Sequence, residues 1–452
     1  MRERRVLVVG TTPDYIAYID KRYSGQALFL TDTAQRVGAA ETAPGKESEI
    51  VCDLLDKEEV FENLQKHLEK FNQSLSGVTC YDCEWLVLAA ELAARFDLPY
   101  SPAAAVRAAR DKYLSKKTWG ENGVRCPRVE LLGTSRQAVG LHGRFEGPVV
   151  LKPLTGSGSE LTFVCYDAQS MMSAVRMIRE GLAQRSNLPM YRLDRGEAAG
   201  EPEPDYPVLA EEMIAGREYS ADFIIEDDRV NIIRVAKKLG EDTLPFGTTR
   251  AYEVPAELPS GMDYLMLANR LYEAAQALGF KRAVCMVDFI VSKDEIVFLE
   301  LTPRIGGDCL PPLVRQCCGL DTIGLALDFA EGKKIEIPSV ESWRKHVGLR
   351  LFATSGGILS AINCEDAGGD ARVKEIYLKR SPGHVIVLPP EDYDSWFLGH
   401  VIFEPEPDTG LKAQGDDILK KIKIEVEKRH DRKNTGFFKA GDRAVSSENR
   451  SA

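Results

Sequence analysis

Residues 298–309, FLELTPRIGGDC, place a carboxylate inside an apolar strand that runs directly into an arginine. The flanking residues are typical of a buried strand, whereas Glu300 interrupts the apolar run. The longer segment 285–302, CMVDFIVSKDEIVFLELT, contains two β-rich halves around a polar centre, which predicts a hairpin.

The register of this hairpin decides what Glu300 faces. A turn centred on Asp294 places Asp288 opposite Glu300, and the same register pairs Ile290 with Phe298. Directly opposed residues have Cβ atoms about 5 Å apart, and opposed like charges destabilise a sheet. Because both faces of the hairpin are apolar, the two acids are expected to be partly buried, with a hard cation such as Mg²⁺ between them. A slipped register with both acids in solvent is the alternative.

Length, charge and cysteines narrow the class of protein. The chain has 452 residues and a net charge of −11, so about two to four domains are expected and a nucleic-acid partner is not. The apolar run 6–9 is too short for a signal peptide, and no segment approaches the roughly 20 apolar residues of a membrane span. The ten cysteines lack regular spacing, which favours reduced thiols in a cytoplasmic protein. At Cys80 and Cys83, a lone CxxC, we expect structural thiols rather than a zinc or redox site.

The chain divides into three folded regions and a tail. The first two mix strands with helices, and the third contains short β-like runs followed by a helix at 416–428. The polar, Pro/Gly-rich stretch Arg185–Pro207 is expected to be a mobile loop, and the polar tail to be disordered. The four ranges are 1–105, 106–335, 340–428 and 429–452.

Two further segments carry residues suited to a nucleotide. VVLKPLTGSGSE (149–160) is an apolar strand with Lys152 near its end, followed by a Gly/Ser loop whose backbone N–H groups can approach phosphate oxygens. VLAEEMIAGREYSADFII (208–225) places Glu211 near the end of one strand and Glu218 at the start of the next. Each pattern alone is also compatible with an ordinary turn and solvated acids.

Taken in order, these segments resemble the ATP-grasp superfamily. Members show an Asp-Lys pair on a helix, a strand-Lys-Pro with a Gly/Ser loop, an acidic hinge, and an acid twelve residues before an E-x-N-P-R strand. The resemblance implies an α/β (α+β) protein with an ATP-grasp fold at 106–335, an N-terminal Rossmann-like α/β domain and a C-terminal β-rich domain. The C-terminal region is faintly similar to L-amino-acid ligases. The matching positions are Asp111-Lys112, Lys152-Pro153, Glu211 to Glu218, Asp288, and Glu300 to Arg304.

The resemblance also implies which residues bind ATP, the expected co-substrate. The acidic hinge would hold adenine and ribose, and the lysines and the Gly/Ser loop would surround the phosphates. The implied adenine and ribose contacts are Glu211, Glu212, Ile214 and Glu218. The implied phosphate contacts are Lys112, Lys152, Gly156, Ser157, Gly158 and Ser159.

The same resemblance assigns a metal site and a catalytic arginine. Asp288 and Glu300 would carry Mg²⁺, with Mn²⁺ as a substitute, and Arg304 would stabilise charge on the reacting phosphoryl group. Two positions depart from the pattern. Thr302 stands where the family has asparagine, and its hydroxyl is a poorer metal ligand than an amide carbonyl. Leu161 replaces a loop glycine, a change expected to stiffen or reshape the lid.

The implied activity is that of an ATP-dependent carboxylate–amine ligase, which forms an amide through an acyl phosphate and releases ADP and phosphate. Its partners would be a small carboxylate and an amine, and a homodimer is left open. Arg250 is the preferred contact for a substrate carboxylate, with Gly306 and Gly307 offering backbone N–H groups. The alternatives are Arg250 as a surface ion-pair residue, a purine-biosynthesis or carboxylase-type reaction, and a non-catalytic nucleotide-binding regulatory protein.

Overall fold

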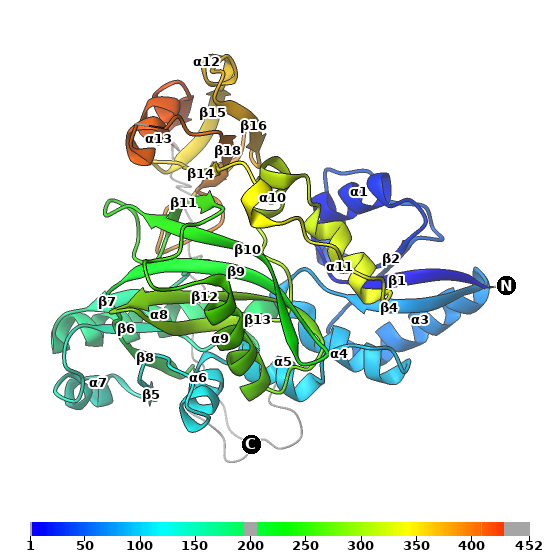
Figure 1. The fold of residues 1–452 in the computed structure, drawn as a ribbon, viewed down its shortest axis with the longest axis horizontal. Coiled ribbons are helices and arrows are strands. Elements are labelled where there is room, and N and C mark those ends of the chain that lie inside the picture. Colours follow the sequence, from blue (N-terminus) through cyan, green and yellow to red (C-terminus); the bar gives the residue numbers. More distant parts are fainter. Residues whose placement is uncertain (1, 194–205, 408, 429–452) are drawn as a thin grey trace, which may run out of the picture.

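The computed structural model describes residues 2–193, 206–407 and 409–428. A large twisted sheet occupies the centre, with the N-terminal domain at one side, a small sheet with two helices below, and the C-terminal region above (Figure 1). The central part of the loop predicted at Arg185–Pro207 and the whole tail predicted at 429–452 lie outside the described residues.

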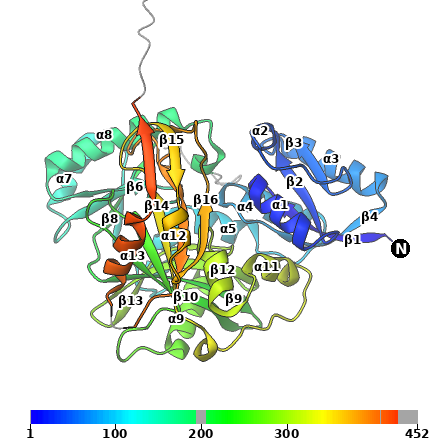
Figure 2. The same cartoon turned by 90° about the horizontal axis from the view of Figure 1, so that it is seen from above.

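The N-terminal domain is a parallel sheet in the order β3-β2-β1-β4, flanked by helices. The two central strands contain continuous buried apolar runs, at 6–9 in β1 and 27–30 in β2, which suits a sheet covered on both faces. Figure 2 shows this domain beside the rest of the molecule. Its elements are β1 (Glu3–Val9), α1 (Pro13–Arg22), β2 (Ala27–Asp32), α2 (Thr33–Val37), β3 (Glu49–Cys52), α3 (Lys57–Lys70), β4 (Gln73–Thr79) and α4 (Leu86–Arg95).

Two helices lead from this domain into a small antiparallel sheet of order β5-β8-β6-β7. Asp111 caps the second of these helices, because its carboxylate accepts from the backbone N–H groups of Tyr113 and Leu114. The elements are α5 (Ala103–Arg110), α6 (Lys112–Glu121), β5 (Val129–Leu132), α7 (Ser135–His142), β6 (Val149–Pro153), β7 (Phe163–Cys165), α8 (Ala168–Gln184) and β8 (Val208–Glu212).

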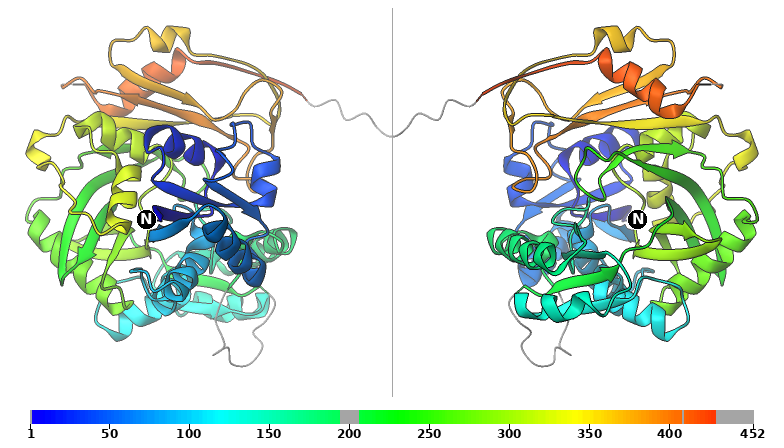
Figure 3. Two further views of the ribbon diagram at one scale, coloured as in Figure 1. Left: turned by 90° about the vertical axis from the view of Figure 1, so that its right-hand side faces the viewer. Right: turned by 90° about the vertical axis from the view of Figure 1, so that its left-hand side faces the viewer.

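The central sheet has eight strands in the order β13-β12-β9-β10-β11-β14-β18-β16. β14 pairs with β11, so the sheet runs without a break past the boundary expected near residue 340. Figure 3 shows the C-terminal strands lying over the rest of the molecule. The elements are β9 (Arg217–Glu226), β10 (Arg229–Gly240), β11 (Thr249–Val254), α9 (Tyr264–Ala277), β12 (Ala283–Ser292), β13 (Glu295–Thr302), α10 (Leu310–Cys318), α11 (Thr322–Ala330), β14 (His346–Phe352), β16 (Val373–Leu378) and β18 (Phe397–Phe403).

A three-stranded sheet of order β17-β15-β19 completes the C-terminal region. The helix predicted at 416–428 is wrong in its second half, because the helix ends at Lys420 and a strand follows. The sequence KIEVE alternates with a period of two, as a strand requires, and pairs with β15. The elements are β15 (Gly357–Asn363), α12 (Glu365–Gly368), β17 (Val385–Ile386), α13 (Leu411–Lys420) and β19 (Lys423–Glu427).

The β12–β13 hairpin places its two interrupting acids opposite each other. Asp288 pairs with Glu300, as the sequence predicts. The turn consists of Lys293 and Asp294, both with positive φ (49° and 64°), whereas the predicted turn is centred on Asp294.

A bulge reconciles this shorter turn with the acid pair. Leu299 is the extra residue, and it shifts the pairing by one between the acids and the turn. Ile290 therefore pairs with Val297, and the predicted pairing of Ile290 with Phe298 is wrong. Bulges commonly re-aim side chains beside functional sites, and this one keeps the two carboxylates opposed.

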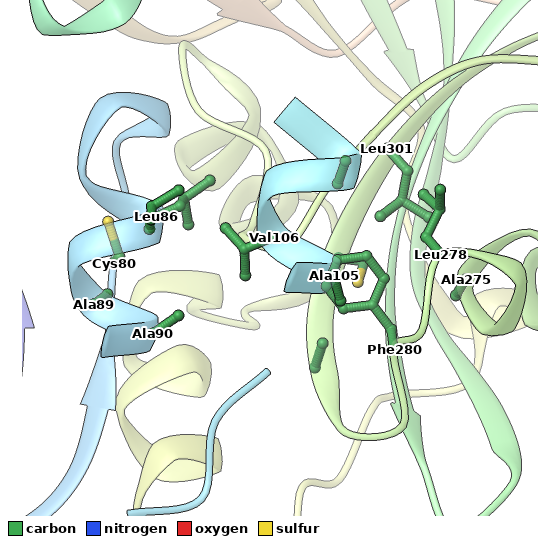
Figure 4. Packing of buried hydrophobic residues seen from close by; sticks show 14 of the residues in the cluster. Cys80, Leu86, Ala89, Ala90, Ala105, Val106, Ala275, Leu278, Phe280 and Leu301 are labelled. Atoms are coloured by element: carbon green, nitrogen blue, oxygen red, sulfur yellow. The ribbon is translucent and has the colours of Figure 1, made fainter. Parts of the chain in front are cut away.

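The largest hydrophobic cluster connects the N-terminal domain to this hairpin. In Figure 4, Val106 of α5 lies between Leu86 of α4 on one side and Phe280 and Leu301 on the other. Successive side chains of a strand point to opposite faces. Burial of Leu301 in this cluster therefore turns the neighbouring Glu300 toward the other face of the sheet.

Candidate active site

A cavity of about 150 Å³ lies between the small antiparallel sheet and the central sheet. Strands β6 and β8 supply one wall, and strands β9, β12 and β13 supply the other. The cavity brings together every residue that the sequence predicts for the nucleotide, with both acids predicted for the metal. These are Lys112, Lys152, Gly156, Ser157, Gly158, Ser159, Glu211, Glu212, Ile214, Glu218, Asp288 and Glu300.

A buried carboxylate holds two lysines at the back of this cavity. Glu211 lies 2.8 Å from the Nζ atoms of both Lys116 and Lys152. Lys116 is fully buried and also donates to the carbonyl of the bulged Leu299 at 2.5 Å. Burial alone would raise the pKa of Glu211, but the two lysines lower it below its usual value. The carboxylate is therefore charged, and its position fixes both ammonium groups.

Lys238 of β10 connects the acid predicted for the ribose with an acid predicted for the metal. Its Nζ pairs with Glu218 and lies 3.1 Å from Asp288 Oδ2. Burial alone would lower the pKa of Lys238, but Asp288 and Glu218 raise it well above its usual value. Lys238 is thus a permanent cation on the cavity wall.

The residues present fit a hard divalent cation between Asp288 and Glu300. Asp288 Oδ1 is buried and has no hydrogen-bond partner among the described residues. Burial raises the pKa of Asp288, whereas Lys112, 3.3 Å from Glu300, and the neighbouring lysines lower the pKa of Glu300 against the effect of burial. Within the described ranges no three His, Cys, Asp or Glu side chains converge on a metal position. Two carboxylates without a third suit Mg²⁺, which completes its shell with phosphate oxygens.

The Gly/Ser loop after β6, residues 156–161, folds over the cavity and is called the nucleotide loop below. Gly156 and Gly158 have positive φ (120° and 65°), a conformation that glycine adopts without strain. Ser159 Oγ donates to the Gly247 carbonyl at 2.8 Å, which ties the nucleotide loop to the β10–β11 connection. Leu161 also has positive φ (55°), but its side chain is buried under α8 and anchors the loop.

A second cavity of about 720 Å³ continues from the first, and the two share Lys112, Lys238, Asp288, Glu300 and much of the nucleotide loop. Thr302, predicted as a metal ligand, lines the second cavity together with Arg304 and Gly307. The further lining residues include Cys83, Arg110, Arg185, Tyr252, Asp308, Arg350, Lys379, Glu391, Asp392, Tyr393, Asp394 and Phe397.

Arg304 lies at the boundary between the N-terminal domain and the central sheet, and residues from both hold its side chain. Its Nε donates to Cys83 Sγ at 3.1 Å, and its Nη1 donates to the carbonyl of Ile305 at 2.6 Å. Cys83 follows β4 in the N-terminal domain, so both regions position the guanidinium. Cys80 is buried, Cys83 is partly buried, and both are free thiols.

A fully buried ion pair lies beneath the loop that carries Arg304. Arg234 donates to both carboxylate oxygens of Asp222, at 3.0 and 2.8 Å, and Asp222 Oδ1 also accepts from the backbone N–H of Gly306 at 3.1 Å. A Cβ on Gly306 would lie 2.5 Å from Arg234. The expected substrate contact of Gly306 is therefore wrong, because its N–H is already bonded and its role is to allow close packing.

Arg250 does not line either cavity. It pairs with Glu241 at 3.2 Å and donates to the Arg350 carbonyl at 2.8 Å. The structure therefore places Arg250 in a partly buried ion pair outside the two cavities, and not beside the position expected for a substrate carboxylate. Arg350 lines the larger cavity instead, with Nε 2.7 Å from Asp308.

Three basic residues that sequence reasoning missed have different degrees of signal. Lys116 lies one helical turn after Lys112, so the shared helix face was readable. Lys238 is the second of two consecutive lysines in β10, and this local pattern does not show which acids it meets. Arg350 has no local signal, because β14 reaches the site only by pairing with β11 across about 100 residues of chain.

A family model described as an ATP-grasp domain matches residues 145–312. This range contains the nucleotide loop, the acidic hinge, both opposed acids and Arg304. Residues 145–312 are thus an ATP-grasp domain, as the sequence motifs predict.

The alignments with sequence relatives cover less than two thirds of each relative's length. The uncharacterized protein y4rH of Sinorhizobium fredii is 24% identical over 324 residues, which cover 69% of this chain and 61% of that protein. Dapdiamide A synthase of Enterobacter agglomerans is 23% identical over 213 residues, which cover 47% of this chain and 46% of the synthase.

A solved structure covers nearly the whole chain. The crystal structure of an L-amino acid ligase from Bacillus licheniformis superposes with a TM-score of 0.72 at 19% identity, covering 94% of this chain and 100% of the ligase. At this identity the similarity shows the fold, and it confirms the predicted α/β class and ATP-grasp fold. In the described part of the chain, no helix combines the length and apolar character needed to cross a membrane.

The two lysines that share Glu211 should respond differently to removal. We expect Lys116→Met to lower the free energy of unfolding by about 2–3 kcal/mol, since a buried charge network loses a partner. Lys152→Met, at the cavity surface, should cost less stability but weaken ATP binding, because it removes a cation facing the nucleotide. Urea unfolding and calorimetric ATP titration measure the two effects. Unchanged ATP affinity in Lys152→Met would contradict the phosphate assignment.

Proposed function

We propose that this protein is an ATP-dependent carboxylate–amine ligase that forms an amide bond through an acyl phosphate and releases ADP and phosphate. The observation that carries the proposal is the continuity of the two cavities across Asp288, Glu300 and Lys238. A nucleotide in the smaller cavity would present its γ-phosphate to substrates in the larger one. The relatives with named activities, a dapdiamide synthase and an L-amino acid ligase, support this class of reaction.

The chain's own residues have separable tasks in this reaction. Lys112 and Lys152 would bind the phosphates, and Glu218 would accept from the ribose hydroxyls. Asp288 and Glu300 would hold Mg²⁺, which neutralises phosphate charge when bound. Phosphoryl transfer depends mostly on positioning and charge neutralisation, so the fixed lysines serve it directly.

Formation of the acyl phosphate and attack by the amine would take place among residues around the larger cavity. Transfer of the γ-phosphoryl group to a carboxylate oxygen makes the carbonyl carbon an electrophile, because phosphate is a good leaving group. Attack by the amine then breaks the bond between carbon and phosphate oxygen and yields the amide and inorganic phosphate. Arg304 would stabilise the charge that develops on the oxygens during both steps.

The larger cavity favours zwitterionic substrates over phosphorylated ones. Arg350 and Asp308 form an ion pair of 2.7 Å on its wall. The Arg350 guanidinium also lies over the rings of Phe352 and Phe397, 4.9 and 4.8 Å from their centroids. The fixed guanidinium would grip a carboxylate, and the adjacent acid would receive an ammonium group. An amino acid carries both groups.

Two other functions remain as outcomes of a direct test. A carboxylase-type or purine-biosynthesis reaction would require bicarbonate or a phosphorylated substrate. A non-catalytic regulatory protein would bind ATP without releasing ADP; Thr302 favours this alternative, whereas Asp288, Glu300 and Arg304 favour catalysis.

The activity is tested by measuring ADP release across pools of amino acids, other carboxylates, bicarbonate and amines, with mass spectrometry of the products. We expect ADP and an amide only when a carboxylate, an amine and Mg²⁺ are all present. Glu300→Gln should lower turnover by roughly 10²–10³-fold or more while the fold is retained. Thr302→Asn, which supplies an amide oxygen at the metal position, should preserve or raise activity. Near-normal turnover in Glu300→Gln would refute the metal assignment.

Arg350 and Arg250 form a matched pair, because they lie on neighbouring strands and only Arg350 lines the larger cavity. We expect Arg350→Lys to raise the KM for the carboxylate or amine substrate with ATP binding unchanged, since lysine cannot replace a bidentate grip. Arg250→Lys should leave both parameters near wild type. Equal effects of the two substitutions would remove Arg350 from the substrate site.

A further inference from the structure

The larger cavity has a wall that lies far from the nucleotide residues in sequence. Residues 387–396 connect β17 to β18 and are called the C-terminal loop below. Four of them line the larger cavity together with Glu160 of the nucleotide loop. They are Glu391, Asp392, Tyr393 and Asp394.

The C-terminal loop is held in one shape by its own hydrogen bonds. Ser395 Oγ donates to the Val387 carbonyl at 3.0 Å and accepts from the Val387 N–H at 3.0 Å, which joins the two ends of the loop. Asp392 Oδ1 accepts from the N–H of Asp394 at 2.8 Å. The loop can therefore be positioned as a unit by a contact at one point.

Arg185, at the end of α8, provides that contact. Its Nε donates to Glu160 Oε1 in the nucleotide loop at 2.8 Å, and its Nη2 donates to the Glu391 carbonyl in the C-terminal loop at 2.7 Å. Its Nη1 donates to the Gly181 carbonyl at 3.1 Å, which fixes the guanidinium to α8. The Arg185 side chain is 11% exposed, and its bonds to Glu160 and Gly181 are partly buried, whereas its bond to Glu391 lies at the surface.

Two aromatic residues strengthen the same junction. Tyr191 OH donates to Glu160 Oε2, which occupies the second oxygen of the carboxylate. Tyr393 packs against the hydrophobic cluster that contains Leu161 and the helices α7 and α8. The C-terminal loop thus contacts the small antiparallel sheet with its helices α7 and α8, from which the nucleotide loop extends. It does so in addition to joining β17 to β18.

We propose that Arg185 is a positioning residue that couples closure of the nucleotide loop on ATP to closure of the C-terminal loop over the substrates. The inference rests on the proposed ligase function. An acyl phosphate is lost when water attacks its carbonyl carbon and the bond to the phosphate oxygen breaks, returning the carboxylate and inorganic phosphate. Joint closure excludes water from the larger cavity while ATP is being consumed.

The coupling is tested by hydrogen–deuterium exchange with a non-hydrolysable ATP analogue and Mg²⁺. In the wild type the nucleotide should slow exchange in both the nucleotide loop and the C-terminal loop. In Arg185→Ala and Arg185→Lys it should slow exchange in the nucleotide loop alone, since neither side chain spans both acceptors. The matched control is Arg176→Ala, an exposed arginine on the same helix, which should behave as the wild type.

Product analysis gives the functional readout of the same variants. The yield of amide per ADP should fall on the order of tenfold in Arg185→Ala, because a misplaced wall admits water to the acyl phosphate. It should stay at the wild-type value in Arg176→Ala. Protection of both loops in Arg185→Ala, or an unchanged yield per ADP, would overturn the coupling. Absence of any nucleotide protection in the wild type would instead overturn the proposed function.

Discussion

The site depends on holding like charges close together in a β-ladder. Asp288 and Glu300 are direct cross-strand partners, an arrangement that destabilises a sheet unless cations compensate it. Lys238 lies beside Asp288, and Lys112 lies beside Glu300. Lys238 comes from β10, which β9 separates from the hairpin, and Lys112 comes from the start of α6. The cations that compensate the acid pair are therefore in place only when the central sheet and the helix have assembled around the hairpin. The charges in the site are therefore balanced only in the assembled fold.

The same constraint explains how the two sheets form one cavity. Glu211 near the end of β8 forms an ion pair with Lys116 of α6, and Lys116 in turn donates to the carbonyl of Leu299 in the β13 bulge. One buried ammonium group thus connects the small sheet, the helix and the hairpin. Beneath the next turn, Asp222 and Arg234 fix the backbone at Gly306 and with it the loop that carries Arg304.

Local sequence patterns predict the parts of this site whose residues are close in the chain. The spacing of Asp288 and Glu300 defines a hairpin register, and the structure confirms that pair even though the bulge at Leu299 shifts the rest of the ladder. Long-range pairing carries no such signal. The guanidinium chemistry that favours Arg250 is shared by Arg350, and which of the two faces the cavity depends on how β11 and β14 pair. The strand at Lys423–Glu427 has a local signal, an alternation of polar and apolar residues, which the helix predicted at 416–428 overlooks. The assignments of individual residues to ATP and Mg²⁺, and a homodimer, stay predictions.

The central claim is that the γ-phosphoryl group of ATP passes to a substrate carboxylate. The direct measurement uses a pool of amino acids labelled with ¹⁸O in their carboxylates, together with ATP, Mg²⁺ and unlabelled amines, and determines the isotope content of the inorganic phosphate by mass spectrometry. The account predicts one ¹⁸O atom in the phosphate for each ADP released, because the carboxylate oxygen leaves with the phosphoryl group. Release of ADP with unlabelled phosphate would contradict it.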